Sequence, residues 1–149
     1  MEHYLALRIG HSVPAVLLML GLLAHIVIVW RAKGKKPEIL QEKLYRTRVI
    51  SLPVFTLLAV SVPITGWWMT HLSGLPLSQK WLMLSIALLP LIFIFGAFLY
   101  SNLSRWQLQL INKEPTRGRD QIFAVIWAVL ILIVLLAISA LMGAKPGFN

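Results

Sequence analysis

Four long apolar stretches dominate the pattern of hydrophobic and polar positions along the chain. They cover residues 4–30, 49–72, 79–102 and 121–143, and the segments between them carry nearly all of the charge. Each stretch holds roughly 22–27 residues, and an α-helix of that length crosses a hydrocarbon core of about 30 Å. The pattern therefore predicts one domain, over residues 1–149, with four membrane-spanning helices.

Short connections join these stretches and predict an all-α fold, an antiparallel four-helix bundle in up-down-up-down order. Small residues within the spans would let neighbouring helices approach closely. We expect the following to mark helix contacts: Gly10, Gly21, Gly66, Gly96, Ser61 and Ser85. Proline inside a span removes one backbone hydrogen bond and favours a kink, and it occurs at Pro14, Pro53, Pro63 and Pro90.

The distribution of basic residues predicts the orientation of the bundle. Seven Lys and Arg residues lie in the connection 31–48 and four in the connection 103–120, whereas the turn at 73–78 has none. Because cytoplasmic loops carry an excess of Lys and Arg, we expect both basic connections in the cytoplasm and both chain termini outside. Interfacial tryptophans fit this orientation, with Trp30 and Trp106 at the inner interface and Trp67, Trp68 and Trp81 at the outer one.

Composition is typical of a membrane protein and excludes some classes of partner and of metal site. Hydrophobic residues make up 58% of the chain, against roughly 45–50% in soluble domains. The excess of 14 Lys and Arg over 5 Asp and Glu gives a net charge of +9. The topology already accounts for this charge, so no nucleic acid partner is expected. There is no cysteine, which excludes disulfides and thiolate metal sites.

The two ends of the first span bear on localisation and on lipid contact. No basic leader or cleavage site accompanies that span, so we expect a multi-pass protein of the bacterial inner (plasma) membrane. Residues 33–48, which follow it, are expected to form a short interfacial helix that begins at Pro37. Ile39, Leu40 and Leu44 make one apolar strip in this segment, and we expect the strip to rest on anionic lipid headgroups.

Few ionisable residues stand inside the predicted spans, and their cost in a bilayer makes each one a functional candidate. His11 lies about 10 Å below the outer end of the first span, and Arg8 precedes it by three residues, on the same helix face. His71 lies at the outer end of the second span, beside Met69, and Met83 lies at a comparable depth on the third.

A buried haem takes axial ligands from two helices, often His/His or His/Met, together with cations for its propionates. His11 paired with His71 or Met83, with Arg8 or Lys80 as the cation, meets this requirement. Haem b is therefore the first cofactor hypothesis. The alternative is that His11 forms a hydrogen bond with a neighbouring Ser or backbone carbonyl, while His71 lies among the headgroups.

His25 stands near the inner end of the first span, fourteen residues after His11. Two haems would need a matching pair of ligands on a second helix, which this chain lacks, so the sequence supports one haem at most. We expect His25 to pair with a polar group on its own side, such as Tyr100, or to snorkel to the interface.

Copper is the second cofactor hypothesis. A free Met1 amine, two deprotonated amides and the His3 imidazole form a square-planar set that suits Cu(II) or Ni(II). His11, His71 and Met69 add imidazole and thioether groups at the outer face, which suit Cu(I). The alternative for residues 1–3 is a chain end without a fixed structure.

Other chemistries find no support in the sequence. No Gly-rich phosphate loop is present, and no acidic residue lies inside a predicted span, so hydrolysis is not indicated. The midplane residues are Leu, Ile, Val and Phe, whereas a transporter usually shows broken helices around a polar midplane site. These observations leave enzymatic activity undecided.

Three segments of the chain resemble a small four-helix membrane superfamily. They are His11 with Gly21, then Leu52-Pro53 through Gly66 with Trp81-Leu82, and lastly residues 141–146. The superfamily includes the membrane domain of the copper-resistance protein CopD and the HemJ-type protoporphyrinogen oxidases. The chain looks most like a branch of predicted integral membrane proteins of unknown function.

This resemblance implies redox or metal chemistry in a four-helix bundle. HemJ-type proteins hold a b-type haem, and a histidine in their first span is functional; that position corresponds to His11. The first span here lacks the Trp and Arg-Pro features of the HemJ type. CopD-like proteins are linked to copper uptake across the inner membrane, which would suit the histidines and methionines at the outer face.

Three functions are therefore considered. The first is a small haem b or metal-binding component of redox or electron transfer. The second is a non-catalytic subunit or assembly factor of a larger membrane complex, or a homo-oligomer. It is favoured by the near-absence of ionisable groups in the third and fourth spans, whose surfaces suit lipid and protein partners equally. The third is copper handling at the outer face.

Overall fold

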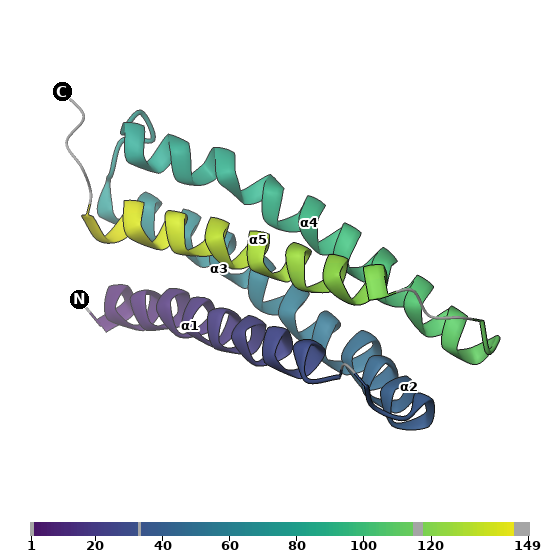
Figure 1. The fold of residues 1–149 in the computed structure, drawn as a ribbon. Coiled ribbons are helices and arrows are strands. Elements are labelled where there is room, and N and C mark those ends of the chain that lie inside the picture. The colour runs from purple at the N-terminus through teal and green to yellow at the C-terminus, as the bar shows by residue number, and fades with distance from the viewer. Residues whose placement is uncertain (1, 33, 115–117, 145–149) are drawn as a thin grey trace.

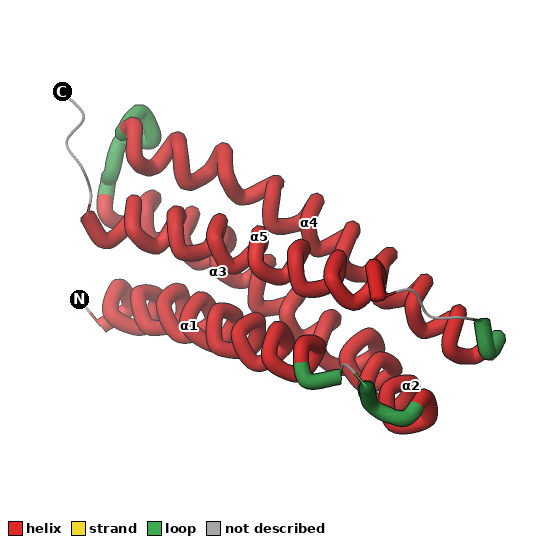
Figure 2. The backbone as a smooth tube through the Cα atoms, viewed as in Figure 1, coloured by secondary structure: helices red, strands yellow, loops and turns green. Residues whose placement is uncertain are grey.

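The computed structural model describes residues 2–32, 34–114 and 118–144, and all regular structure in these residues is helical (Figures 1 and 2). The helices are α1 (Glu2–Trp30), α2 (Pro37–Arg46), α3 (Leu52–Ser73), α4 (Lys80–Ile111) and α5 (Gly118–Ala144), and a π-helical turn, η1 (Thr47–Ser51), joins α2 to α3. Four helical segments are long and apolar enough to cross a membrane, namely α1, the continuous run from α2 to α3, α4 and α5. The predicted all-α bundle with four spans is confirmed.

The two ends of the bundle differ in what they carry. One end, the turn end, holds the start of α1, the turn at 74–79 between α3 and α4, and the close of α5 (Figure 1). The opposite end, the basic end, holds α2 and the connection from α4 to α5. The positive-inside rule predicts that the turn end faces outward.

Contacts between the helices follow the order α3, α1, α5, α4. The extensive pairs are α3 with α1, α1 with α5 and α5 with α4, while α2 and η1 touch α4 at the basic end. α3 and α4 are joined by a short turn, yet they do not form an extensive pair. The bundle is therefore open between α3 and α4, and the two cavities described below lie along this opening.

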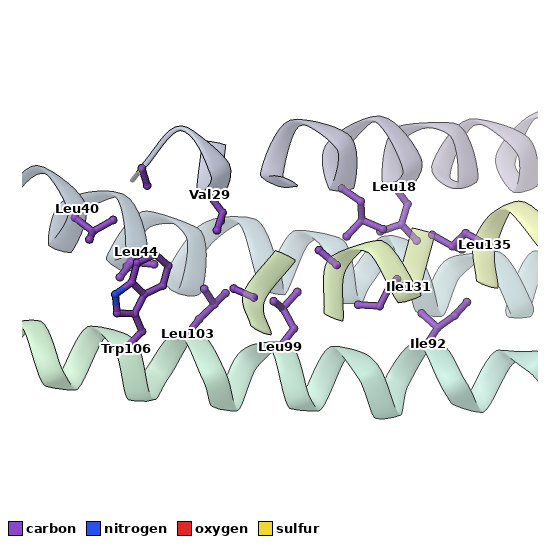
Figure 3. Packing of buried hydrophobic residues seen from close by; sticks show 14 of the residues in the cluster. Leu18, Val29, Leu40, Leu44, Ile92, Leu99, Leu103, Trp106, Ile131 and Leu135 are labelled. Carbon is purple, nitrogen blue, oxygen red and sulfur yellow. The ribbon is translucent and has the colours of Figure 1, made fainter. Parts of the chain in front are cut away.

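The hydrophobic core extends along α4 beyond the predicted span, to the basic end (Figure 3). Leu103 and Trp106 of α4 are almost fully buried, and Leu40 and Leu44 of α2 pack over this part of α4. Two expectations are corrected here. Trp106 is a core residue and not an interfacial one, and only Ile39 of the α2 strip is exposed, since Leu40 and Leu44 are buried.

Two of the predicted small-residue contacts occur where α1 crosses α3. A Cβ atom on Gly21 would collide with the ring of Phe55, and a Cβ atom on Gly66 would press on the ring of His11. The other two glycines were wrongly predicted to be contacts, because a Cβ atom on Gly10 or Gly96 would have no neighbour within 4 Å. The α1–α3 crossing is therefore the place where glycine is needed.

We expect the substitution Gly21→Ala to destabilise the fold by about 1–3 kcal/mol, as overpacking of a core contact usually does. The added methyl group would push the Phe55 ring away from α1. Thermal unfolding of the detergent-solubilised protein measures the effect, with Gly10→Ala as the matched control because its surroundings are open. Equal stability of the two variants would show that the contact has no energetic importance.

Candidate functional site

The larger of the two cavities lies at the turn end and is bounded by all four long helices. Its volume is about 570 Å³, within the range of roughly 300–1,000 Å³ that is typical of small-molecule sites. Its polar and aromatic lining comes from α1, α3 and α4: Tyr4, Arg8, His11, Ser12, Trp67, Thr70, Ser73 and Trp81. α3 and α5 add two thioethers, Met69 and Met142, and aliphatic side chains complete the wall.

His11 is held against α3 through one of its ring nitrogens. Nδ1 lies 2.9 Å from the backbone carbonyl of Val62 and 3.2 Å from Oγ1 of Thr65. A carbonyl oxygen can only accept, so Nδ1 carries the proton and donates. The Thr65 hydroxyl donates to the Ser61 carbonyl of its own helix at 2.8 Å, and its oxygen is thus available as a second acceptor for Nδ1.

In the neutral imidazole, a proton on Nδ1 leaves a free lone pair on Nε2. Among the described residues, Nε2 has no hydrogen-bond partner, and His11 lines the turn-end cavity. Histidines that bind metals in proteins usually donate their other ring N–H to a carbonyl or carboxylate, which fixes the tautomer and the ring orientation. His11 has this arrangement. The predicted hydrogen bond to a carbonyl is present, and it leaves the second nitrogen available to a ligand.

Gly66 provides the space in which the His11 ring sits. A Cβ atom at Gly66 would lie 3.1 Å from Cε1 and 3.4 Å from Nδ1 of His11. The ring therefore packs directly on the backbone of α3, one turn from the Val62 carbonyl that accepts its proton. His11 and Gly66 belong to two of the three segments that carry the resemblance to the four-helix superfamily, and the structure brings the two residues into contact.

The cavity carries positive charge near the turn end. Arg8 lies on the same side of α1 as His11, is exposed, and lines the cavity. No carboxylate among the described residues lines it, and Arg8 forms no ion pair with any of them. Lys80, the other cation considered for this end, is exposed and lies outside the lining. An anionic group in this cavity would meet Arg8.

The structure brings only some of the predicted site residues together. Arg8, His11 and Met69 share the cavity, whereas His71 and Met83 are exposed and contribute nothing to its wall. His71 follows Met69 by two residues, which turns it about 200° around α3. In the described part of the chain, no group of three His, Asp or Glu side chains is placed to hold a metal ion.

His3 lies in the first turn of α1, is exposed, and does not line the turn-end cavity. The square-planar copper site also needs Met1, which lies outside the described residues.

His25 does not lie where the sequence predicts it. It is only 4% exposed, so it does not reach the interface, and its Nε2 has no partner among the described residues. Tyr100 is half exposed and forms no hydrogen bond with it.

A polar layer at the basic end was missed by the sequence analysis. Asn102 Nδ2 donates to the Asp120 carbonyl at 2.7 Å, and Gln121 Nε2 donates to the Val29 carbonyl at 2.8 Å. These bonds tie the start of α5 to α4 and to the end of α1. Asp120, which precedes the predicted span at 121–143, is 8% exposed within the first turn of α5.

Comparison with known proteins gives one match. A family model described as predicted integral membrane protein (DUF2269) covers residues 5–146, which is nearly the whole chain. No curated protein and no solved structure matches the chain. The match covers all four long helices and the cavity at the turn end.

Proposed function

The chain belongs to the DUF2269 family of predicted integral membrane proteins, and we propose that it is a haem b protein of the bacterial inner membrane that takes part in electron transfer. One observation carries the proposal. His11 lines a cavity of about 570 Å³ while its Nδ1–H is held by α3, and its Nε2 has no hydrogen-bond partner among the described residues. The resemblance of His11 to the functional first-span histidine of HemJ-type proteins supports the same assignment.

The side chains around the cavity suit a porphyrin. His11 would supply one axial ligand through Nε2, and the Val62 carbonyl and Thr65 would hold the imidazole in that orientation. Arg8 would pair with a propionate. Met69 and Met142 are the candidates for a second axial ligand, because both line the cavity whereas His71 does not. Haem b, when bound, supplies one-electron redox chemistry, and the apolar walls exclude water around it.

The optical spectrum of the detergent-purified protein tests the proposal. We expect a Soret band in the air-oxidised protein and sharp α and β bands after dithionite reduction, together with iron near one per chain. A flat visible spectrum without stoichiometric iron, after expression with adequate haem supply, contradicts the proposal. In that case a non-catalytic membrane subunit becomes the better account.

We expect Arg8→Gln to weaken haem binding up to about fivefold without abolishing it, because Arg8 is exposed and an exposed ion pair contributes at most about 1 kcal/mol. Haem titration of the apoprotein measures the change. Lys80→Gln is the matched control, since Lys80 is a cation near the same end that lies outside the cavity wall. Equal weakening by both substitutions would indicate a general effect of surface charge.

Copper handling is a second candidate because of one specific feature, the two thioethers in the same cavity as His11. Met69, Met142 and the His11 imidazole are a soft donor set of the kind that Cu(I) prefers. Metal analysis of the sample used for the spectrum separates the two candidates. Stoichiometric copper with no Soret band would favour this one.

A further inference from the structure

The second cavity lies nearer the basic end, along the same opening between α3 and α4. Its volume is about 300 Å³, which is within the size range of small-molecule sites. Leu18 of α1 and Ile131 of α5, both labelled in Figure 3, line it together with residues of α3 and α4. Because α3 and α4 do not pack extensively against each other, the cavity opens sideways, toward the hydrocarbon of the bilayer.

The lining of this cavity is apolar and aromatic, and it is uncharged. Phe55 stands on α3, and Phe93 and Tyr100 stand on α4. Gly96 also lines the cavity, and a Cβ atom there would have no neighbour within 4 Å. The absent side chain at Gly96 therefore adds to the free space. A phosphate or carboxylate headgroup would find no cation among the residues of this wall.

Two hydroxyl groups are the polar features of the wall. The Thr56 hydroxyl donates to the Leu52 carbonyl of its own helix at 2.9 Å, so its proton is already used. The Tyr100 hydroxyl has no partner among the described residues. Tyr100 is half exposed and lines the cavity, so its hydroxyl is free to donate to an uncharged ligand there.

We infer that this cavity binds a membrane-soluble quinone, with the flat ring between the aromatic side chains and a carbonyl oxygen accepting the Tyr100 proton. The apolar tail would leave through the opening between α3 and α4. Such a ligand is flat and uncharged, carries hydrogen-bond acceptors and dissolves in the bilayer. These properties match the aromatic, uncharged lining of the cavity and its Tyr100 hydroxyl. The binding itself rests on this cavity alone. Only its use as the redox partner of the turn-end cavity rests on the proposed function.

The position of the cavity agrees with that use. On α3 the two linings are separated by three residues, from Ala59 to Val62, and on α4 by three residues, from Leu89 to Ile92. Each interval is a step of three residues, slightly less than one helical turn, and measures about 4.5 Å along the helix. A quinone ring bound in this cavity would therefore lie beside the turn-end cavity, with no water between the two.

Photolabelling tests the inference. The protein, in phosphatidylcholine nanodiscs, is irradiated with a photoreactive benzoquinone that carries a decyl chain, and labelled peptides are identified by mass spectrometry. We expect label on segments 52–59 and 92–100, displaced by unlabelled decyl-quinone but not by an equal excess of a fatty acid. Label spread evenly over the lipid-facing helices, or displaced equally by the fatty acid, overturns the inference; the second result would indicate an acyl-chain groove.

Two variants sharpen the test. Gly96→Leu fills the free space and is expected to lower specific labelling about tenfold, whereas Gly10→Leu, which also adds a side chain in open surroundings, leaves it unchanged. Tyr100→Phe is expected to weaken competition by decyl-quinone about three- to tenfold, the effect of one lost hydrogen bond. Unchanged labelling in Gly96→Leu contradicts the inference.

The outcomes for the two cavities are independent. Competed labelling in a protein with no Soret band would support the quinone site while the haem proposal fails. A clear haem spectrum with no competed labelling would overturn the quinone site alone. His11→Ala, which empties only the turn-end site, is expected to leave the labelling intact.

Discussion

Replacing His11 with alanine is expected to remove the Soret band from the purified protein. The substitution deletes the imidazole of His11, which lines the turn-end cavity and whose Nε2 has no hydrogen-bond partner among the described residues. It also removes the contacts to Val62 and Thr65, so the position can neither bind nor orient a ligand. The absorbance spectrum and the iron content per chain measure the loss.

The matched control for this experiment is His71→Ala. His71 is the other histidine predicted near the turn end, but it is exposed and lies outside the cavity wall. We expect the spectrum of His71→Ala to equal that of the unmodified protein. Haem loss in His71→Ala, or a normal spectrum in His11→Ala, would contradict the ligand assignment.

The second large effect is expected from Gly66→Val. The valine side chain would occupy the space of the His11 ring, since even a single Cβ atom would lie 3.1 Å from Cε1. The imidazole would leave its contacts with α3, and losses of such supporting contacts lower metal affinity about 10- to 100-fold. Haem titration of the apoprotein measures the affinity.

Gly10→Val is the control for helix propensity and for added volume. Gly10 is also helical, but its surroundings are open and it does not line the cavity. We expect Gly10→Val to bind haem normally. If both valine variants lose affinity for haem to the same extent, the space that Gly66 leaves for the His11 ring has no special importance. The geometry proposed for His11 is then wrong.

The sequence predicted the spans well because each is a long uncharged stretch, and the physical signal is strong. It placed the end of the third span at residue 102, whereas α4 continues to Ile111. A charge such as that of Arg105 ends an apolar stretch of sequence but does not end a helix. Leu103, Trp106 and Leu110 recur at helical spacing, and α2 covers that face instead of lipid.

The sequence predicted the level along the bundle at which the candidate residues lie, but not the direction in which each side chain points around its helix. His11, Arg8 and Met69 were placed at one level of the bundle, and the structure puts all three around one cavity. His71 was placed at the same level, yet it faces away, because a difference of two residues turns a side chain by about 200°. Depth follows from counting residues, whereas rotation depends on which helices pack together.

The open side of the bundle was the feature least accessible to sequence. Short connections favour contact between consecutive helices, and the turn at 74–79 joins α3 and α4 closely. Two of the three extensive pairs, α1 with α3 and α4 with α5, do join consecutive spans, but α3 and α4 do not form one. Gly21 and Gly66 allow α3 to approach α1 closely. Residues of both α3 and α4 line the two cavities.

The most direct test of the central claim is chemical rescue of His11→Gly by imidazole. The glycine leaves space beside Gly66 in which a free imidazole can take the place of the deleted side chain. We expect the variant to lack a Soret band as purified, and to regain it when haem and imidazole are added together, but not with haem alone. Failure of imidazole to restore the band, in a variant that unfolds at the same temperature as the unmodified protein, would contradict the claim that His11 binds haem through Nε2.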